Sequence, residues 1–282
     1  AAHTGSDKHV SGVYESTAAT VQPALLARGL RRVALEKGIR IHENTPMRRL
    51  KRSRPPYVVT PRGSITADKV VIAMNAWATM FPELRRTIIV ISSDIVATEA
   101  FPERLNASGW RDGMAVSDSR TLVNYYRTTP DGRIAFGTGG GKLSYGNRVT
   151  PKFNGGTPRS EEVAGYFRRI YPDFKDVGIA SHWTGPIDRS LSGLPFFGHL
   201  GGRADIVYGL GFSGNGVGPT LIGAKILSSL VLNELDEWSE CGLVRDSVGQ
   251  FPREPLRYFG GSMATKANRR KEALENQGKT PG

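Results

Sequence analysis

The feature that most constrains the fold is a glycine-rich loop between a predicted strand and a predicted helix, in the last third of the chain. Residues 209–218 read Gly-Leu-Gly-Phe-Ser-Gly-Asn-Gly-Val-Gly, and five of these ten residues are glycine. A short strand pattern precedes the loop, and Pro219 opens an apolar helical pattern that reaches Trp238. A helix N-terminus presents unpaired N–H groups, and glycine lets other groups approach the backbone, so the pattern favours a negatively charged or dipolar ligand. A tight turn without a ligand is the alternative.

The same loop contains the spacing Gly209-x-Gly211-x-x-Gly214, which is a fingerprint of dinucleotide-binding folds. Such a fold also needs a second strand after the helix, ending in an acidic residue that binds ribose. Here Asp236 and Glu237 lie at the end of the helix itself, and only turn-like sequence follows. We therefore interpret the loop as one that contacts a ligand without being the diphosphate-binding element of a dinucleotide fold.

The chain around this loop predicts an α/β (α+β) fold. A helical pattern begins at Pro23 and ends at Gly38. The run 70–73 is continuously apolar, which is typical of a strand buried on both faces. The short strands predicted in this part of the chain cover residues 39–43, 47–51, 57–60, 64–67 and 70–73. Together with the glycine loop and its helix, these segments predict one domain that is interrupted in sequence.

The interruption has the pattern of an antiparallel sheet. A long β-rich segment, 87–99, is followed by two strand patterns joined by the turn Pro130-Asp-Gly132. The elements predicted after the first segment are strands at 122–128 and 133–138, a helix at 161–170 and a strand at 179–184. We therefore divide the chain into residues 1–86, an inserted antiparallel domain at 87–184, residues 185–260, and a polar, basic tail at 261–282 with weak helical character.

Composition narrows the classes of function. The chain has 282 residues, of which 38 are Lys or Arg and 26 are Asp or Glu, so the formal net charge is +12. This charge favours anionic partners, but the basic residues form small clusters without a nucleic-acid-binding motif. The single Cys241 excludes an internal disulfide framework and a cysteine-based zinc site, and no metal-ligand spacing is present. No apolar run is long enough for a membrane helix, and we expect a cytoplasmic protein.

Three segments keep an order and spacing that point to a known family. The first covers residues 21–30 and 38–46, the second covers 65–77, and the third runs from Trp183 to the end of the glycine loop. These segments resemble the D-amino-acid oxidase superfamily of FAD-dependent oxidoreductases. Gly185-Pro-Ile-Asp-Arg-Ser190 and Phe251-Pro-Arg-Glu-Pro255 are most similar to its branch of aminophosphonate and γ-glutamylputrescine oxidoreductases.

The resemblance implies a partial FAD-binding, Rossmann-like domain with an inserted antiparallel-sheet substrate domain. It implies non-covalent FAD, because the cysteine of the covalent relatives has no counterpart near residue 183. The cofactor contacts that it implies come from Thr45, Pro46, Met47, Ala73, Asn75, Ala76, Trp77, Gly185, Gly211, Phe212, Ser213, Gly214, Asn215, Gly216, Val217 and Gly218. The substrate contacts that it implies come from Tyr125, Arg127, Arg189 and Asn215, with Asn124 and Tyr126 beside them.

Two departures from the family pattern shape the expected function. The family begins with a strand, a G-x-G-x-x-G turn and a helix that hold the FAD diphosphate, and nothing in this chain corresponds to that unit. We therefore expect a partner chain, or a part removed from this one, to supply it. Glycine oxidase has a substrate-binding arginine where this chain has Ile187, which argues against a simple α-amino acid substrate. The candidates for binding a different anion, such as a phosphonate, are Arg127, Arg133, Lys142 and Arg189.

The leading hypothesis is therefore oxidation of the C–N bond of a primary or secondary amine, with hydride transfer to the flavin N5. In such enzymes the protein supplies orientation and electrostatics, so no residue is assigned as a catalytic acid or base. The second hypothesis is a non-catalytic remnant or binding subunit of the same fold without FAD. A basic nucleic-acid-binding protein is the third.

Overall fold

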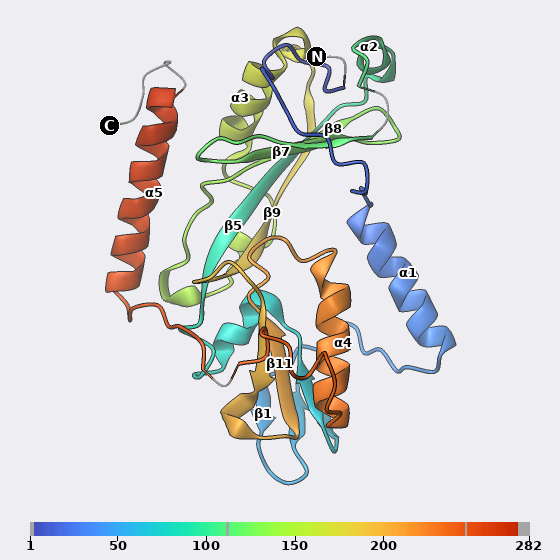
Figure 1. The fold of residues 1–282 in the computed structure, drawn as a ribbon, viewed down its shortest axis with the longest axis vertical. Coiled ribbons are helices and arrows are strands. Elements are labelled where there is room, and N and C mark those ends of the chain that lie inside the picture. The colour runs from blue at the N-terminus through green and yellow to red at the C-terminus, as the bar shows by residue number, and fades with distance from the viewer. Residues whose placement is uncertain (1–2, 111–112, 246, 276–282) are drawn as a thin grey trace. The chain divides into compact units, whose positions relative to one another are not determined.

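The chain folds into two compact units, each built from segments that are far apart in the sequence. The structure is a computed structural model that describes residues 3–110, 113–245 and 247–275 (Figure 1). We call the first the sheet unit; it consists of residues 1–20, 89–187 and 251–282. We call the second the loop unit; it consists of residues 21–88 and 188–250 and contains the glycine loop.

The sheet unit is built on five strands in the order β6-β7-β8-β5-β9 (Figure 1). Neighbouring strands in the run from β6 to β5 are antiparallel, as the inserted domain was expected to be. The strand bounds are β5 Ile88–Thr98, β6 Ala115–Ser117, β7 Asn124–Thr128, β8 Ile134–Thr138 and β9 Ile179–Ser190. The helices of this unit are α2 Pro102–Ala107, α3 Ser160–Ile170 and α5 Leu256–Glu275.

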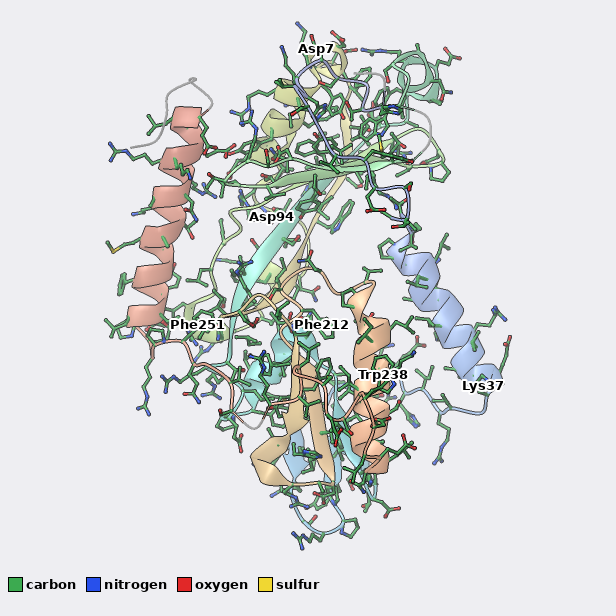
Figure 2. All side chains as sticks on the ribbon, in the orientation of Figure 1. Asp7, Lys37, Asp94, Phe212, Trp238 and Phe251 are labelled. Atoms are coloured by element: carbon green, nitrogen blue, oxygen red, sulfur yellow. The ribbon has the colours of Figure 1, made fainter. Side chains whose placement is uncertain are left out.

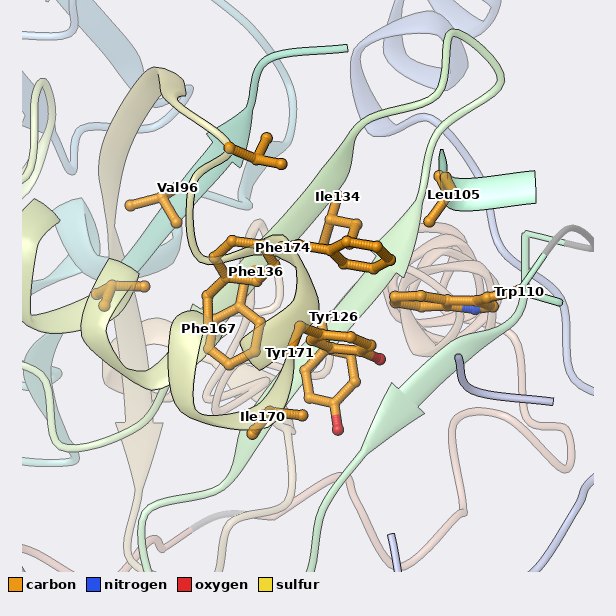
Figure 3. Packing of buried hydrophobic residues seen from close by; sticks show 12 residues of the cluster. Val96, Leu105, Trp110, Tyr126, Ile134, Phe136, Phe167, Ile170, Tyr171 and Phe174 are labelled. Carbon is orange, nitrogen blue, oxygen red and sulfur yellow. The ribbon is translucent and has the colours of Figure 1, made fainter. Parts of the chain in front are cut away.

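One face of this sheet carries an aromatic core under α3. In β7 and β8 alternate side chains point inward, which places Tyr126 and Phe136 on the buried face, where their rings stack 4.9 Å apart. Phe167 of α3 and the stacked pair Trp110 and Tyr171 complete the cluster (Figure 3). Each such ring contributes roughly 1.5–3 kcal/mol by leaving water. The sheet unit therefore has a dense core of its own.

The loop unit contains a small mixed sheet in the order β10-β11-β4. The strand β11, Ile206–Leu210, runs parallel to β4, Val70–Ile72, and antiparallel to β10, Phe196–His199. Helix α4, Pro219–Leu232, packs on β11 through Ile226 and Leu230. The unit also holds helix α1 Pro23–Glu36, the 3-10 helix η1 Asn75–Met80, and a second sheet of β1 Arg49–Lys51, β2 Tyr57–Thr60 and β3 Gly63–Thr66.

Four local expectations differ from the structure. Residues 39–43 form no strand, and Val71 in β4 is 46% exposed, so that strand is not buried on both faces. Helix α4 ends at Leu232, because Asn233 takes a left-handed conformation with a φ of 58°. In place of a weakly helical tail, α5 covers residues 256–275, of which residues 261–275 lie in the segment expected to be a tail.

The stability of α5 comes from polar contacts rather than from an apolar stripe. Glu272 is buried, where it accepts hydrogen bonds from Arg120 and from the backbone N–H of Leu122. Near the start of the helix, Glu254 accepts hydrogen bonds from Arg257 and from the N–H of Gly146. Of these partners, Arg120, Leu122 and Gly146 are more than 100 residues away in the sequence, so helical periodicity alone did not reveal them. Across the described part of the chain, no helix is both long and apolar enough to cross a membrane.

Candidate functional site

The glycine loop starts where β11 ends and turns through left-handed backbone conformations. Gly211 has a φ of 83°, Ser213 a φ of 57° and Gly214 a φ of 95°. A Cβ atom on Gly211 would lie 2.7 Å from a ring carbon of Phe196, which is closer than real contacts allow. Glycine is therefore required at position 211 by both the backbone angle and the available space.

Ser213 connects the loop to the end of β9. It is buried, which is unusual for a residue in a left-handed conformation on a loop. Its Oγ donates to the carbonyl of Gly211 at 3.0 Å and accepts the backbone N–H of Ser190 at 3.2 Å. Hydrogen bonds of Ser213 therefore hold the first part of the loop against the end of β9, while residues 214–218 lie nearer to solvent.

The N-terminus of α4 is open to a ligand. Gly218 stands at the capping position and offers no side-chain cap, and Pro219 has no N–H to be satisfied. Within the described residues, no protein atom accepts a hydrogen bond from the backbone N–H groups of residues 216–218. These amides, at the positive end of the helix dipole, form a site for a negatively charged or acceptor group.

The parallel pair β4 and β11 brings a second predicted segment to the same edge of the sheet. Both strands end at this edge, because Ile72 of β4 pairs with Tyr208 of β11. Residues 73–77 therefore leave the sheet beside the glycine loop, outside the carboxyl ends of the strands, where α/β folds bind ligands. Of the predicted residues there, Asn75 has a φ of 48° and accepts the N–H of Ala76, while Trp77 is half exposed.

The other predicted cofactor residues are placed less distinctively. Thr45 donates its hydroxyl to the carbonyl of Glu43, and Met47 packs on the core of the loop unit. Among the described residues, no backbone hydrogen bond to Pro46 is formed. Gly185 lies on β9 in the sheet unit.

The substrate residues predicted on β7 divide between the two faces of the sheet. Tyr125 and Arg127 share one face, whereas Asn124 and Tyr126 point into the core and are buried. Asn124 and Tyr126, which were expected beside the substrate residues, therefore do not share their face, because strand side chains alternate. Arg189 and Asn215 are exposed residues of the loop unit.

The face that carries Tyr125 is shaped by a glycine. A Cβ on Gly137 would lie 2.2 Å from the Tyr125 ring, so the ring lies flat over β8. The Tyr125 hydroxyl is hydrogen-bonded to Ser93 of β5 at 2.7 Å, and burial raises the pKa of that hydroxyl. Arg127 lies in the next row, opposite Ala135. This part of the sheet face therefore places Arg127 and the Tyr125 ring beside the small residues Ala135 and Gly137.

Two other residues that were proposed to bind an anion, Arg133 and Lys142, have different surroundings. Arg133 is held by Asp131 at 2.7 Å and donates to the carbonyl of Thr98 at 3.0 Å, so its charge is used in a turn. Lys142 is exposed on the loop after β8. Neither residue has the placement of a binding group on the sheet face.

Two buried aspartates were not predicted from the sequence. In the loop unit, the carboxylate of Asp188 accepts the N–H of Gly211 at 2.6 Å. In the sheet unit, Asp94 on β5 pairs with Arg159 at 2.7 Å (Figure 2). Burial disfavours the charge of Asp94, but hydrogen bonds from Thr157, Arg159 and Ser92 together hold its pKa below the ordinary value. The one available signal was an aspartate within the Gly185–Ser190 motif.

Comparisons with known proteins show which family the sequence resembles. The family model for FAD-dependent oxidoreductases, DAO, matches residues 1–230. Gamma-glutamylputrescine oxidoreductase of Escherichia coli is 28% identical over 89% of this chain and 55% of its own length. A probable oxidoreductase, OrdL, of Haemophilus influenzae is 26% identical over 82% of this chain and 52% of its own.

A solved structure shares the fold. Glycine oxidase of Geobacillus kaustophilus superposes with a TM-score of 0.64 at 19% identity, covering 79% of this chain and 58% of that one. The chain spans about half the length of the curated relatives that it matches. With the family model matching most of its residues, the chain belongs to the DAO family of FAD-dependent oxidoreductases.

Proposed function

We propose that this chain supplies the flavin-contacting loop and the substrate face of an oxidoreductase that oxidises the C–N bond of a primary or secondary amine. The observation that carries the proposal is the open N-terminus of α4, whose amides at residues 216–218 lie at the same sheet edge as residues 73–77. The family supports the cofactor, because its members are FAD-dependent oxidoreductases.

The donor set of the loop unit fits FAD. Open amides and a helix N-terminus suit the carbonyl edge of a flavin, which gains negative charge on reduction. Residues 214–218 and 73–77 would hold that edge, and Thr45 to Met47 would lie toward the rest of the cofactor. When bound, FAD accepts a hydride from the substrate carbon. This chain's own residues orient the two partners and stabilise charge.

The sheet face supports a substrate with an anionic group. Arg127 stands on a floor of small residues, with Ala135 opposite it and Gly137 in the adjacent row. A guanidinium offers paired donors to a tetrahedral or planar anion, which suits an aminophosphonate or a similar acidic amine. Tyr125, fixed by Ser93, borders the same surface and limits the orientations of a bound amine.

A further protein part completes the proposed enzyme. In the loop unit, α1 has no buried residue, and its apolar side chains Leu26, Leu30 and Val33 are exposed. Val71 of β4 is exposed as well. We infer that a diphosphate-binding unit, on a partner chain or elsewhere in a longer chain, covers this apolar surface and holds the remainder of FAD.

The test combines this chain with such a unit and FAD, without oxygen. An aminophosphonate is expected to bleach the visible flavin band, and Arg127→Gln is expected to raise the substrate concentration for half-maximal bleaching about tenfold or more, as for the loss of a charged hydrogen bond. Arg133→Gln is the matched control and should leave it unchanged. Absence of bleaching with any amine contradicts the reaction, and equal bleaching by R127Q contradicts the role of Arg127.

A further inference from the structure

The carboxylate of Asp188 lies beneath the glycine loop and is 3% exposed. One of its oxygens accepts the N–H of Gly211 at 2.6 Å. The backbone amides of Phe212 and Ser213 also favour the charged form of this carboxylate. Three successive amides thus act on one anion, at the place where positive φ angles turn the backbone. This is the arrangement of a backbone nest, in which the bound anion belongs to the protein itself.

Among the described residues, no Lys, Arg or His forms an ion pair with Asp188, and the adjacent Arg189 is exposed while Asp188 is buried. Burial raises the pKa of Asp188, and the amides of Gly211, Ser213 and Phe212 oppose that rise. The contacts of the carboxylate are therefore dedicated to the loop backbone.

The loop needs such an anchor. Glycine loses more conformational freedom on ordering than any other residue, and this loop contains five. Asp188 and Ser213 hold residues 211–213 against the end of β9. At the start of α4, the amides of residues 216–218 have no acceptor among the described residues.

We propose that Asp188 is a positioning residue: its carboxylate fixes residues 211–213 so that the amides of residues 216–218 stay aimed at the cofactor. The part that concerns the cofactor rests on the proposed function. The part that concerns the loop stands without it. Asparagine at this position keeps one acceptor oxygen but turns an N–H₂ group toward the amides, so it is expected to hold the loop only in part.

The test measures backbone amide exchange in the full chain for wild type, Asp188→Ala and Asp188→Asn, without FAD. Exchange at residues 211–213 should accelerate about tenfold or more in D188A and less in D188N. Asp236→Ala is the matched control, because Asp236 also accepts two backbone amides, those of Trp238 and Ser239, at the other end of α4. It should accelerate exchange at residues 238 and 239 and leave 211–213 unchanged.

The second arm titrates each folded variant with FAD in the presence of a diphosphate-binding unit. The dissociation constant should rise about tenfold in D188A, less in D188N, and stay unchanged in D236A. Unchanged exchange at 211–213 in D188A or, should D188A not fold, in D188N overturns the anchoring role. Faster exchange with unchanged FAD affinity overturns the positioning role. A wild-type chain that takes up no FAD even with that unit present contradicts the proposed function, and the exchange arm then decides the role of Asp188.

Discussion

Among the described residues, each unit buries one aspartate, and the two units hold its charge in different ways. In the sheet unit, Asp94 is 1% exposed and meets the guanidinium of Arg159, which is itself buried and also contacts Glu162. In the loop unit, Asp188 is 3% exposed and accepts the backbone amide of Gly211. The pKa falls for the first and rises for the second. Similar burial therefore accompanies pKa shifts in opposite directions. A full opposite charge compensates the carboxylate of Asp94, whereas backbone dipoles compensate that of Asp188.

The same contrast appears in the apolar packing. The sheet unit encloses an aromatic core beneath α3, with Phe136 and Phe167 fully buried (Figure 3). The loop unit leaves Leu30 of α1 63% exposed. The sheet unit thus acts as a self-contained scaffold, whereas the loop unit presents backbone donors and apolar surface to other groups.

The largest expected effect comes from breaking the ion pair. Arg159→Ala leaves the Asp94 carboxylate buried without its cation, which should lower the free energy of unfolding by about 3–5 kcal/mol. Arg168→Ala is the matched control on the same helix, because Arg168 is partly exposed and lies 3.8 Å from Glu161. It should change stability by less than about 0.5 kcal/mol. Denaturant unfolding measures both, and equal effects would remove the distinction between the pairs.

An intermediate effect compares the apolar surfaces of the two units. Val163→Ala removes two buried methyl groups from α3 and should cost about 2 kcal/mol, including the cavity that remains. Leu30→Ala on α1 should change the unfolding free energy by less than about 0.5 kcal/mol in the chain alone. Addition of the proposed diphosphate-binding unit should make L30A weaken that association. A large cost of L30A in the isolated chain would show that α1 is packed there.

Whether a part of this contrast could be predicted depends on how far apart in the sequence the contacting residues lie. The glycine loop, its helix and the two strand patterns at 122–128 and 133–138 are local patterns, and they predicted the fold class correctly. Asp94 and Arg159 are 65 residues apart, and Asp188 and Gly211 are 23 apart, so no local period links either pair. The exposure of Val71 was missed because an apolar run does not reveal which face has a covering partner.

The smallest expected effect is in the pH dependence of stability. The raised pKa of Asp188 contributes stability below the ordinary aspartate value, and this contribution is lost as the pH rises through the raised pKa. The lowered pKa of Asp94 works the other way: its contribution is present above the ordinary value and is lost as the pH falls through the lowered pKa. The stability difference between wild type and Asp188→Asn should therefore decrease with rising pH in the acid range. An increase would mean that a cation compensates Asp188.

Backbone amide exchange with and without FAD tests the central claim most directly. The account predicts that FAD slows exchange at residues 214–218 and 73–77 of the loop unit and leaves α3 of the sheet unit, residues 160–170, unchanged. The measurement uses the chain together with a diphosphate-binding unit, so that the cofactor is fully held. Binding of FAD with no change at residues 214–218 would contradict the claim that the open N-terminus of α4 belongs to the flavin site.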